Sequence, residues 1–393
     1  MIKVNCICDG ISFPHGEATN QRIIMIGKAL MAKGDEYRVF VNCLRPRNKL
    51  NKERRGRYDN IPFRHMNKSL VIGRPKWTDA IDYYFVGFYN TSRLIRSWRR
   101  DQQQVIYLYS QGSLYNAFVS FLAFVYNIPV VQEVNEWQDD LKRTNLRSFI
   151  YKSVMFRWAK GAVSISDKIT GEINKYKLPG NNINIIQVPI LADKLEWSEN
   201  KQATEKTFVW CGQLDGYYND VILIMKAFAK FNNQIPGYKV IICGKYKPST
   251  SFIIQEALNN LKLDKNLVEF TGFVSDEQLR EYCQKATALI SPLWNDQRSL
   301  ARFPTKIASY LFAARPVLTC GVGETGKYLK DHENAFFFEP GDESGLCRLM
   351  ERCALDQSLA NQIGQEGYHL ASGAFDFRRH SEKLNNLFEL AIT

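Results

Sequence analysis

Short apolar runs alternate with amphipathic stretches along most of this chain. Residues 4–8 form an apolar run, and the following stretch carries Ile23, Ile26 and Leu30 at the spacing of one helix face. Further strand patterns cover residues 37–42, 105–109, 129–134, 161–166, 184–188, 207–211, 239–243 and 335–339. Because strands that alternate with helices form parallel sheets covered on both faces, the pattern predicts an α/β protein.

A polar stretch at residues 190–205 interrupts this alternation and predicts a linker. We therefore expect a first domain at 1–190, a linker at 191–205, a second domain at 206–375 and a last helical segment at 376–393. Helical patterns between these limits cover 19–33, 77–100, 113–126, 148–158, 221–231, 344–355, 359–370 and 377–390. Asp167 is a candidate cap for the helix that follows the 161–166 strand.

The segment 303–318 has the pattern of a loop, a helix, a turn and a buried strand. Pro304 suits the first turn of that helix, where no backbone N–H is needed. Arg298, Arg302 and Lys306 flank the same end. A helix N-terminus carries partial positive charge, so this end suits a pyrophosphate. An ordinary helix with a solvated basic first turn accounts for these residues equally well.

Residues 268–292 precede this segment with a strand, a turn containing Gly272, a short helix and a second strand. Together with Phe303-Pro304-Thr305-Lys306 and Arg315-Pro316-Val317-Leu318, the run resembles the nucleotide-sugar domain of GT-B glycosyltransferases. The resemblance is to the retaining glycosyltransferase family 4, also called glycosyl transferases group 1. It is strong from about residue 207 onward and diffuse before that.

This resemblance implies the GT-B fold, with two Rossmann-like doubly wound domains facing across a cleft and a last helix that crosses back to the first domain. It also implies a hexosyltransferase-type enzyme that moves a sugar, with retention, from a nucleotide-diphosphate-sugar donor to a glycan or polyprenyl-linked acceptor. Cell-surface polysaccharide synthesis is the expected context. We expect no metal, and no cofactor beyond the donor substrate.

The donor site is expected to combine a glycine loop of the first domain with strand ends and the 304 helix of the second. Two cations of the family pattern are missing, because Gln213 stands at the position of the Arg and Asn219-Asp220 stand near that of the Lys. Other lysines and arginines can substitute for them. The candidate donor-binding residues are Gly16, Gly212, Gln213, Lys245, Arg298, Arg302, Pro304, Thr305, Lys306 and Ser309.

A further departure concerns a pair of glutamates that the family carries around the key helix. Ala301 and Ser309 stand at the matching positions, and a Ser hydroxyl cannot accept two hydrogen bonds from a ribose as a carboxylate does. Asp296 and Glu324 are nearby acids that can serve instead. The departure also motivates an alternative, a catalytically inactive GT-B homologue that acts as partner or scaffold of an active transferase.

Three acids are candidate catalytic residues. Glu133 and Glu136 follow a buried strand of the first domain, where they can position an acceptor hydroxyl or stabilise an oxocarbenium-like transition state. Asp296 is the third. The alternative for the Glu133 region is a plain surface position, or a helix cap at Asn135.

The positive charge of the chain is concentrated in one segment. The chain carries a formal net charge of +12, and residues 45–100 alone hold 15 Lys and Arg against four Asp and Glu. Such a segment favours an anionic membrane surface, a phospholipid-like acceptor or nucleic acid. We expect no nucleic acid, because no binding motif accompanies the charge. A solvated basic loop and helix face is the alternative. The aromatic residues at 77–98 are consistent either with core packing or with docking at a membrane interface.

The remaining composition points to a cytoplasmic protein, peripheral on the inner face of the plasma membrane. Hydrophobic residues make up 45% of the chain, and its longest apolar stretch, 117–125, is too short to span a bilayer. The nine cysteines form no Cys-x-x-Cys pair, so we expect reduced structural thiols. The five scattered histidines give little support to a metal site.

Overall fold

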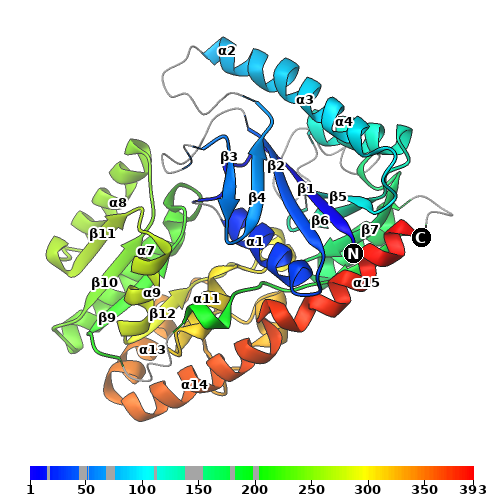
Figure 1. Cartoon of the computed structure of the whole chain (residues 1–393). Coiled ribbons are helices and arrows are strands. Elements are labelled where there is room, and N and C mark those ends of the chain that lie inside the picture. Colours follow the sequence, from blue (N-terminus) through cyan, green and yellow to red (C-terminus); the bar gives the residue numbers. More distant parts are fainter. Residues whose placement is uncertain are drawn as a thin grey trace. The chain divides into compact units, whose positions relative to one another are not determined.

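The structure is a computed structural model that contains two β-sheets, each built mainly of parallel strands (Figure 1). Residues Met1–Leu191 and Phe377–Thr393 form one compact unit, and Ala192–Asp376 form the second. The structure describes residues 1–15, 18–43, 51, 53–67, 76–109, 113–137, 154–177, 182–197 and 203–393.

The described part of the first unit contains a sheet in the order β3-β4-β2-β1-β5-β6-β7-β8. Neighbouring strands are parallel except β3 and β4, which form an antiparallel pair at one edge. The strands are β1 (Lys3–Asp9), β2 (Glu36–Asn42), β3 (Arg55–Tyr58), β4 (Ile61–His65), β5 (Gln104–Tyr109), β6 (Val130–Val134), β7 (Ala159–Ser164) and β8 (Asn184–Gln187).

Helices cover both faces of this sheet. Along β2, Tyr37 donates its hydroxyl to the carbonyl of Ile23 on α1 at 3.1 Å, whereas Phe40 packs on Trp98 of α3 with ring centroids 5.5 Å apart. Since residues three apart on a strand point to opposite faces, α1 and α3 lie on opposite sides. The helices are α1 (Ala18–Met31), α2 (Lys76–Ile81), the π-helix η1 (Asp82–Gly87), α3 (Phe88–Trp98), α4 (Leu114–Val125), α6 (Asp167–Tyr176), the 3₁₀ turn η6 (Phe377–His380) and α15 (Ser381–Ile392).

The second unit has a fully parallel sheet in the order β11-β10-β9-β12-β13-β14. The strands are β9 (Thr207–Cys211), β10 (Lys239–Cys243), β11 (Val268–Gly272), β12 (Ala288–Ser291), β13 (Val317–Thr319) and β14 (Phe336–Phe337). The helices are α7 (Leu214–Gln234), α8 (Pro248–Asn260), α9 (Asp276–Lys285), α10 (Gln297–Ala301), α11 (Lys306–Phe312), α12 (Glu324–Tyr328), α13 (Glu343–Leu355) and α14 (Gln357–Ala374), with the 3₁₀ turns η4 (Lys194–Glu196) and η5 (Lys265–Leu267).

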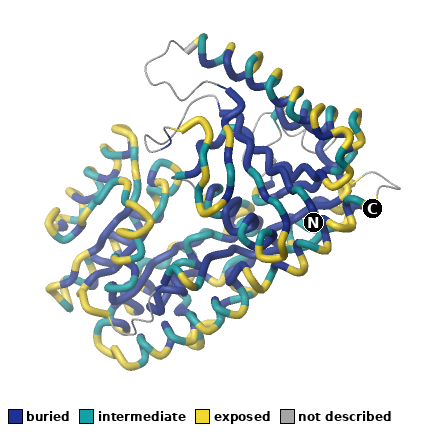
Figure 2. Tube along the Cα trace, viewed as in Figure 1, coloured by how far each residue is buried: buried dark blue, intermediate teal, exposed yellow. Residues whose placement is uncertain are grey.

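The strands of both units are largely buried, while exposed positions recur along the helices (Figure 2). In the second unit, Phe208 of β9 packs edge-on against Phe231 of α7 with centroids 5.2 Å apart, and it stacks on Tyr238 at 5.6 Å. Burying such aromatic side chains is the main stabilising contribution to this core. This burial explains why residues 208–211 have the unbroken apolar pattern of a strand covered on both faces.

Capping residues and backbone angles set the ends of the helices. The starts of two helices differ from those expected from the sequence. Ser166, rather than Asp167, caps α6, because Ser166 has the extended backbone of a cap and accepts from the Ile169 N–H at 3.2 Å. The helix expected at 221–231 begins at Leu214, because a kink at the non-helical Tyr217 joins an extra turn to it. The expected helix at 148–158 lies largely outside the described residues.

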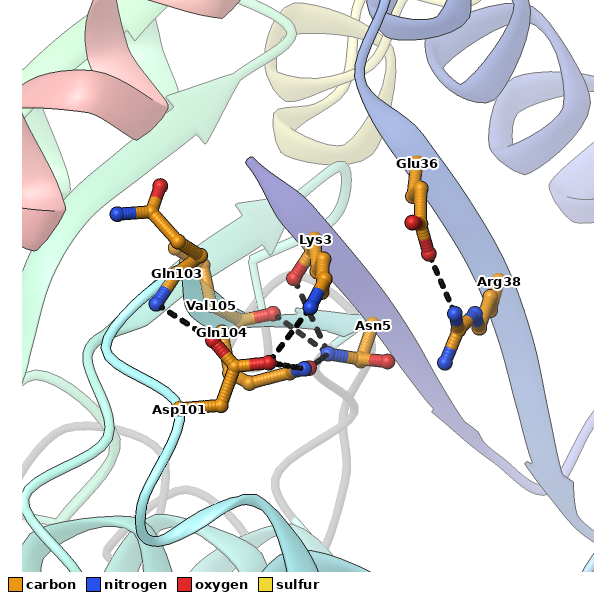
Figure 3. A network of polar contacts seen from close by, with 8 residues as sticks. All are labelled: Lys3, Asn5, Glu36, Arg38, Asp101, Gln103, Gln104 and Val105. Carbon is orange, nitrogen blue, oxygen red and sulfur yellow. Dashed lines mark hydrogen bonds and ion pairs between the residues drawn. The ribbon is translucent and has the colours of Figure 1, made fainter. Parts of the chain in front are cut away.

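Polar side chains close the amino-terminal edge of the first sheet (Figure 3). Lys3 Nζ contacts Asp101 Oδ2 at 2.7 Å, and Asn5 Nδ2 donates to Gln104 Oε1 at 2.6 Å. The hydrogen bond from Lys3 lowers the pKa of Asp101 to about 2. Since that pKa is depressed, its stabilising contribution is present above the pKa of the unfolded carboxyl and is lost as pH falls toward 2.

The fold class expected from the sequence is confirmed. Two α/β units with parallel, Rossmann-like sheets are present, and α15 packs against α1 and the strands of the first unit although it follows the second unit in sequence (Figure 1). The chain passes from the first unit to the second between Leu191 and Ala192, and it returns to the first unit between Asp376 and Phe377.

The packing of α14 generates a stability prediction. An added Cβ on Gly364 would lie 2.4 Å from the carbonyl oxygen of Ala314, a backbone atom that cannot rotate away. We expect Gly364→Ala to reduce the free energy of unfolding by about 1–3 kcal/mol. Gly373 of the same helix is the matched control, because a Cβ there meets nothing within 4 Å, and Gly373→Ala should stabilise by up to about 1 kcal/mol. Urea unfolding measures both; equal effects would contradict the packing.

Candidate functional site

The candidate site in the second unit begins where β9 ends. The hydroxyl of Tyr310 on α11 accepts from the N–H of Cys211 at 2.8 Å, and Lys306 Nζ donates to the Cys211 carbonyl at 3.2 Å. Two side chains of α11 thus hold the last residue of β9 through both of its backbone polar groups. This attachment fixes Lys306 at the carboxyl end of the sheet, the edge where ligands bind in open α/β folds.

Lys306 also lies over an aromatic ring. Its Nζ is 4.6 Å from the ring centroid of Trp210, a distance at which a cation is attracted to the ring face. Burial lowers the pKa of Lys306, and the nearby carboxylate of Asp220 opposes that shift. The result is an ammonium group held in a partly desolvated position, where its attraction for an anion is stronger than in water.

Arg298 and Arg302 meet at Tyr217. Both guanidinium groups donate to the Tyr217 hydroxyl, Arg298 at 2.9 Å, and both lie within 5 Å of its ring centroid. The Nε–H groups of both arginines are buried and have no hydrogen-bond partner among the described residues. Buried donors without partners are costly, so holding the two guanidinium groups in this position has a free-energy cost.

One acid lies close to these cations. Asp220 is 2% exposed and accepts from Trp294 Nε1 at 2.7 Å. Burial raises the pKa of Asp220, while Lys306, the Trp294 hydrogen bond, Arg302 and Arg298 lower it. Three cations around one carboxylate leave a net positive charge at this strand end, as an anion site requires.

The helix starts around this cluster differ in detail from the expectation. Helix α11 begins at Lys306 with Thr305 as its N-cap, so Pro304 precedes the first turn rather than occupying it, and its carbonyl accepts from the Ile307 N–H at 3.0 Å. Asp296 caps α10, the helix that bears Arg298, by accepting from the Ser299 N–H at 2.6 Å. Pro304, Thr305 and Ser309 are all partly exposed.

The loops after β9 and β10 come very close together. Gly244 has a φ of 151°, and an added Cβ would lie 1.9 Å from the Gly212 carbonyl oxygen, so only glycine is accommodated there. Gln213 is exposed and precedes α7 without a side-chain capping bond. Lys245 is exposed, with Nζ 4.6 Å from the ring centroid of Phe273. Gly212, Gln213 and Lys245 therefore follow neighbouring strands at the same sheet edge.

The first unit holds the other two candidate catalytic acids. Glu133 of β6 is 1% exposed, forms an ion pair with Arg22 at 3.0 Å and accepts from the Tyr107 hydroxyl. Burial raises the pKa of Glu133, and Arg22 lowers it. Glu136 follows the strand and is exposed, while Asn135 donates to the Tyr109 hydroxyl at 2.6 Å. Gly16, the third candidate of this unit, lies outside the described residues.

The part of the chain that carries the cation cluster is similar to a known protein family. Residues 205–356 match the family Glycosyl transferases group 1. The matched residues lie within the second unit. No curated protein matches the sequence. No helix in the described ranges is long and apolar enough to cross a membrane.

Solved structures that resemble the whole chain are GT-B glycosyltransferases, so the fold is GT-B. Anabaena HepE, in complex with UDP and glucose, is 16% identical, with a TM-score of 0.72 and 98% of each chain covered. Sucrose-phosphate synthase from Thermosynechococcus elongatus is 13% identical, with a TM-score of 0.73 and the same coverage. A glycosyltransferase from Rickettsia africae is 16% identical, with a TM-score of 0.68 and 100% and 99% of the chains covered.

Within the matched residues, 205–356, the structure places the two positions where the resemblance implies a glutamate. Ala301 ends α10 and is 2% exposed, and Ser309 is partly exposed on α11. Glu324, a nearby acid, is 4% exposed and lies 3.7 Å from Lys327 Nζ. It begins α12, beside a cavity of about 700 Å³ whose lining includes Leu300, Gly321, Gly323, Phe338 and Arg348.

Sequence patterns did not single out Tyr217 or Asp220 as members of the candidate site in the second unit. Tyr217 lies at a helix kink, and Asp220 gains its role from Trp294, which is 74 residues away in the chain. The available signal was weak. An acid directly before the apolar positions Val221 and Ile224 faces the buried side of a helix, where a charge needs a partner.

The buried pair in the first unit gives a prediction. Arg22→Met leaves the Glu133 carboxylate buried without its cation, and it removes the donor to the Val188 carbonyl at 2.9 Å. We expect a loss of about 3–5 kcal/mol in the free energy of unfolding. The matched control is Arg38→Met, which breaks a partly exposed pair with Glu36 and should cost about 1 kcal/mol or less. Urea unfolding of both variants checks this; a similar small loss in each would show that the buried pair is not structural.

Proposed function

We propose that this protein is a retaining, hexosyltransferase-type enzyme that moves a sugar from a nucleotide-diphosphate donor to a glycan or lipid-linked acceptor. The observation that carries the proposal is the cluster of Lys306, Arg298 and Arg302 at the end of β9, within the residues that match the group 1 family. Retention is taken from the resemblance to family 4 alone. Cell-surface polysaccharide synthesis is the proposed context.

The proposed chemistry requires charge stabilisation on the leaving group. The bond between the anomeric carbon and the diphosphate oxygen breaks, and its electron pair goes to the diphosphate. The acceptor oxygen forms the new bond to the anomeric carbon, and its proton passes to the departing diphosphate oxygen. Lys306 and the two arginines are proposed to bind the negative charge that develops on the departing diphosphate. Because Lys306 is already held by Trp210 and Cys211, little reorganisation is needed when that charge appears.

The acids are proposed to act in different ways. Glu136, which is exposed after β6, is the proposed contact to the acceptor hydroxyl. Glu133 is buried against Arg22, and we propose that it positions the end of β6. Asp296 caps the helix that bears Arg298 and is proposed to orient that guanidinium. Gly16, Gly212, Gln213, Lys245, Pro304, Thr305 and Ser309 remain proposed donor contacts.

UDP is the proposed nucleotide of the donor. Anabaena HepE, a structural neighbour of this chain, has been solved with UDP, with UDP and glucose, and with UDP-glucose. The proposed acceptor is a glycan or a polyprenyl-linked precursor, and the excess of cations in residues 45–100 supports a cytoplasmic enzyme that works at an anionic membrane surface. No metal or further cofactor is part of the proposal.

A second candidate function rests on the missing glutamates. Ala301 and Ser309 provide no carboxylate where the resemblance places one, so a ribose loses an acceptor of hydrogen bonds. An inactive GT-B homologue that supports another transferase is therefore the alternative. It differs from the first proposal in requiring no binding of a nucleotide sugar.

Nucleotide binding tests the proposal. Thermal shifts with UDP, GDP, ADP, dTDP and CMP should show stabilisation by one diphosphate, with UDP expected. Lys306→Met should weaken that binding about tenfold or more, because it removes a charge-assisted contact of roughly 1.5–3 kcal/mol. Lys265→Met is the matched control, since Lys265 is an exposed lysine of η5 beyond the cluster.

The outcomes separate the two candidates. Stabilisation by UDP that is lost in Lys306→Met and kept in Lys265→Met supports the transferase. Equal binding by both variants would contradict the assignment of the cation cluster to the diphosphate. Absence of a shift with every nucleotide, together with stable association with another transferase, would favour the inactive homologue.

A further inference from the structure

One face of the first unit exposes an unusual row of apolar side chains. Helices α2, η1 and α3 run on from one another, and along them Trp77, Ile81, Phe85 and Tyr89 recur at every fourth position (Figure 1). Their exposed fractions are 66%, 47%, 71% and 61%. Side chains four apart lie on the same side of a helix, so these four form a single exposed row.

The same row ends in arginines. Arg93 continues the spacing of four, and its guanidinium lies 5.8 Å from the ring centroid of Tyr89. Arg96, Arg99 and Arg100 follow, and they line a shallow surface pocket of about 380 Å³. Residues 83–100 contain no Asp or Glu. The exposed charge beside the aromatic row is therefore of one sign.

A second helix extends this surface. The ring of Phe88 on α3 lies 5.2 Å from Tyr115 and 4.8 Å from Phe118 on α4, centroid to centroid, so the two helices pack together. Helix α4 has no charged residue. Four more exposed apolar residues lie on it, Leu114, Phe121, Phe124 and Val125. Nine of the 17 large apolar side chains exposed in the described residues belong to this group of helices, which marks it as an interaction surface.

The exposed row is not needed to attach these helices to the sheet. On the opposite side, Tyr83 donates to the Asp9 carboxylate at 2.6 Å, and an added Cβ on Gly87 would lie 2.2 Å from the side chain of Asn42. Asp79 and Asp82 face inward too, each 5% exposed. In α2 and η1, polar groups are thus buried while the apolar residues of the row point to solvent, the reverse of the usual amphipathic arrangement. Helix α3 is attached through its buried Ile95 and Trp98.

We propose that this face binds an anionic lipid bilayer. We call it the aromatic–arginine face and define it by Trp77, Ile81, Tyr84, Phe85, Tyr89, Arg93, Arg96, Arg99, Arg100, Leu114, Phe121, Phe124 and Val125. Aromatic rings settle at the level of lipid headgroups, aliphatic and Phe side chains enter the acyl boundary, and the guanidinium groups bind headgroup phosphates.

The charge and the apolar residues of the aromatic–arginine face favour a bilayer over other binding partners. A second copy of this face would offer no acidic partner to the four arginines, because the face itself carries none. Nucleic acid would satisfy the arginines but leave Ile81, Phe85 and Phe124 without apolar contact. The inference extends the proposed lipid-linked acceptor, and it rests on the proposed function for that link alone.

Flotation of the full chain with vesicles tests the face. Vesicles of phosphatidylcholine and phosphatidylglycerol at about 7:3 should carry the protein, pure phosphatidylcholine should carry less, and added salt should weaken the association. The double variants Phe85→Ser with Tyr89→Ser, and Phe121→Ser with Phe124→Ser, should each weaken binding about tenfold. Replacing Arg93, Arg96, Arg99 and Arg100 by Gln should weaken it by about 100-fold.

Matched controls lie elsewhere on the surface. Phe252→Ser with Ile253→Ser removes two exposed apolar residues of α8, of which Phe252 is 72% exposed. Replacing the exposed Lys33, Lys239, Lys262 and Lys265 by Gln removes the same number of charges. Both control variants should bind vesicles within about twofold of the wild type, because none of these residues belongs to the face.

Several results would overturn the inference. A wild-type protein that does not float with anionic vesicles at low salt excludes it, as do face variants that bind like the wild type or controls that lose as much. A dimer in sedimentation velocity that dissociates in Phe85→Ser with Tyr89→Ser, without flotation, assigns the face to a second copy. We expect the stabilisation by UDP, measured on the same variants, to be unchanged. Vesicle binding without any nucleotide binding would support the membrane-binding face and contradict the proposed transferase function.

Discussion

Three cations stay together at the end of β9 because a carboxylate and two aromatic rings lie among them. Unscreened repulsion between Lys306, Arg298 and Arg302 would otherwise separate them or remove the proton from the lysine. Asp220 supplies one negative charge, and it keeps its position through the indole N–H of Trp294. The rings of Trp210 and Tyr217 supply the remaining attraction. The arrangement leaves a surplus of positive charge in the cluster, which is the property that suits this strand end to the proposed diphosphate.

Much of the fold could be predicted from the sequence, for a physical reason. The strands β9 and β10 lie at the residues expected for them, 207–211 and 239–243, because a parallel strand covered on both faces must be apolar at its buried positions. Limits that depend on competition between neighbours were harder. Either Ser166 or Asp167 can cap a helix, and the backbone angle that favours Ser166 is set by the chain arriving from β7. The early start of α7 depends on a kink at Tyr217 that periodicity does not record.

The candidate site could be predicted only as far as its motif. Lys306, Arg298 and Arg302 could be predicted because they flank the start of one helix in the sequence, whereas Tyr217 and Asp220 join them through packing between segments far apart in sequence. For Glu133 the sequence suggests exposure, whereas the structure shows the residue buried. Its place near the end of an apolar run suggests exposure, but β6 has neighbours on both sides and Arg22 reaches it from α1, so the carboxylate is enclosed. Whether a residue near a strand end faces solvent depends on the helix above it, and the sequence of the strand does not specify that helix.

The departures from the family pattern are best judged together. Relative to the pattern that the resemblance implies, two cations are absent near Gln213 and Asn219, and two carboxylates are absent at Ala301 and Ser309. The two losses cancel in net charge. Lys306, Arg298 and Arg302 still outnumber the single carboxylate of Asp220, so the site keeps the positive charge that the proposed diphosphate would need. The missing carboxylates affect a neutral ribose, which a hydroxyl such as Ser309 can contact at lower strength. A site that had lost its cations alone would be poorly suited to the proposed diphosphate donor, whereas this one keeps three cations against one carboxylate.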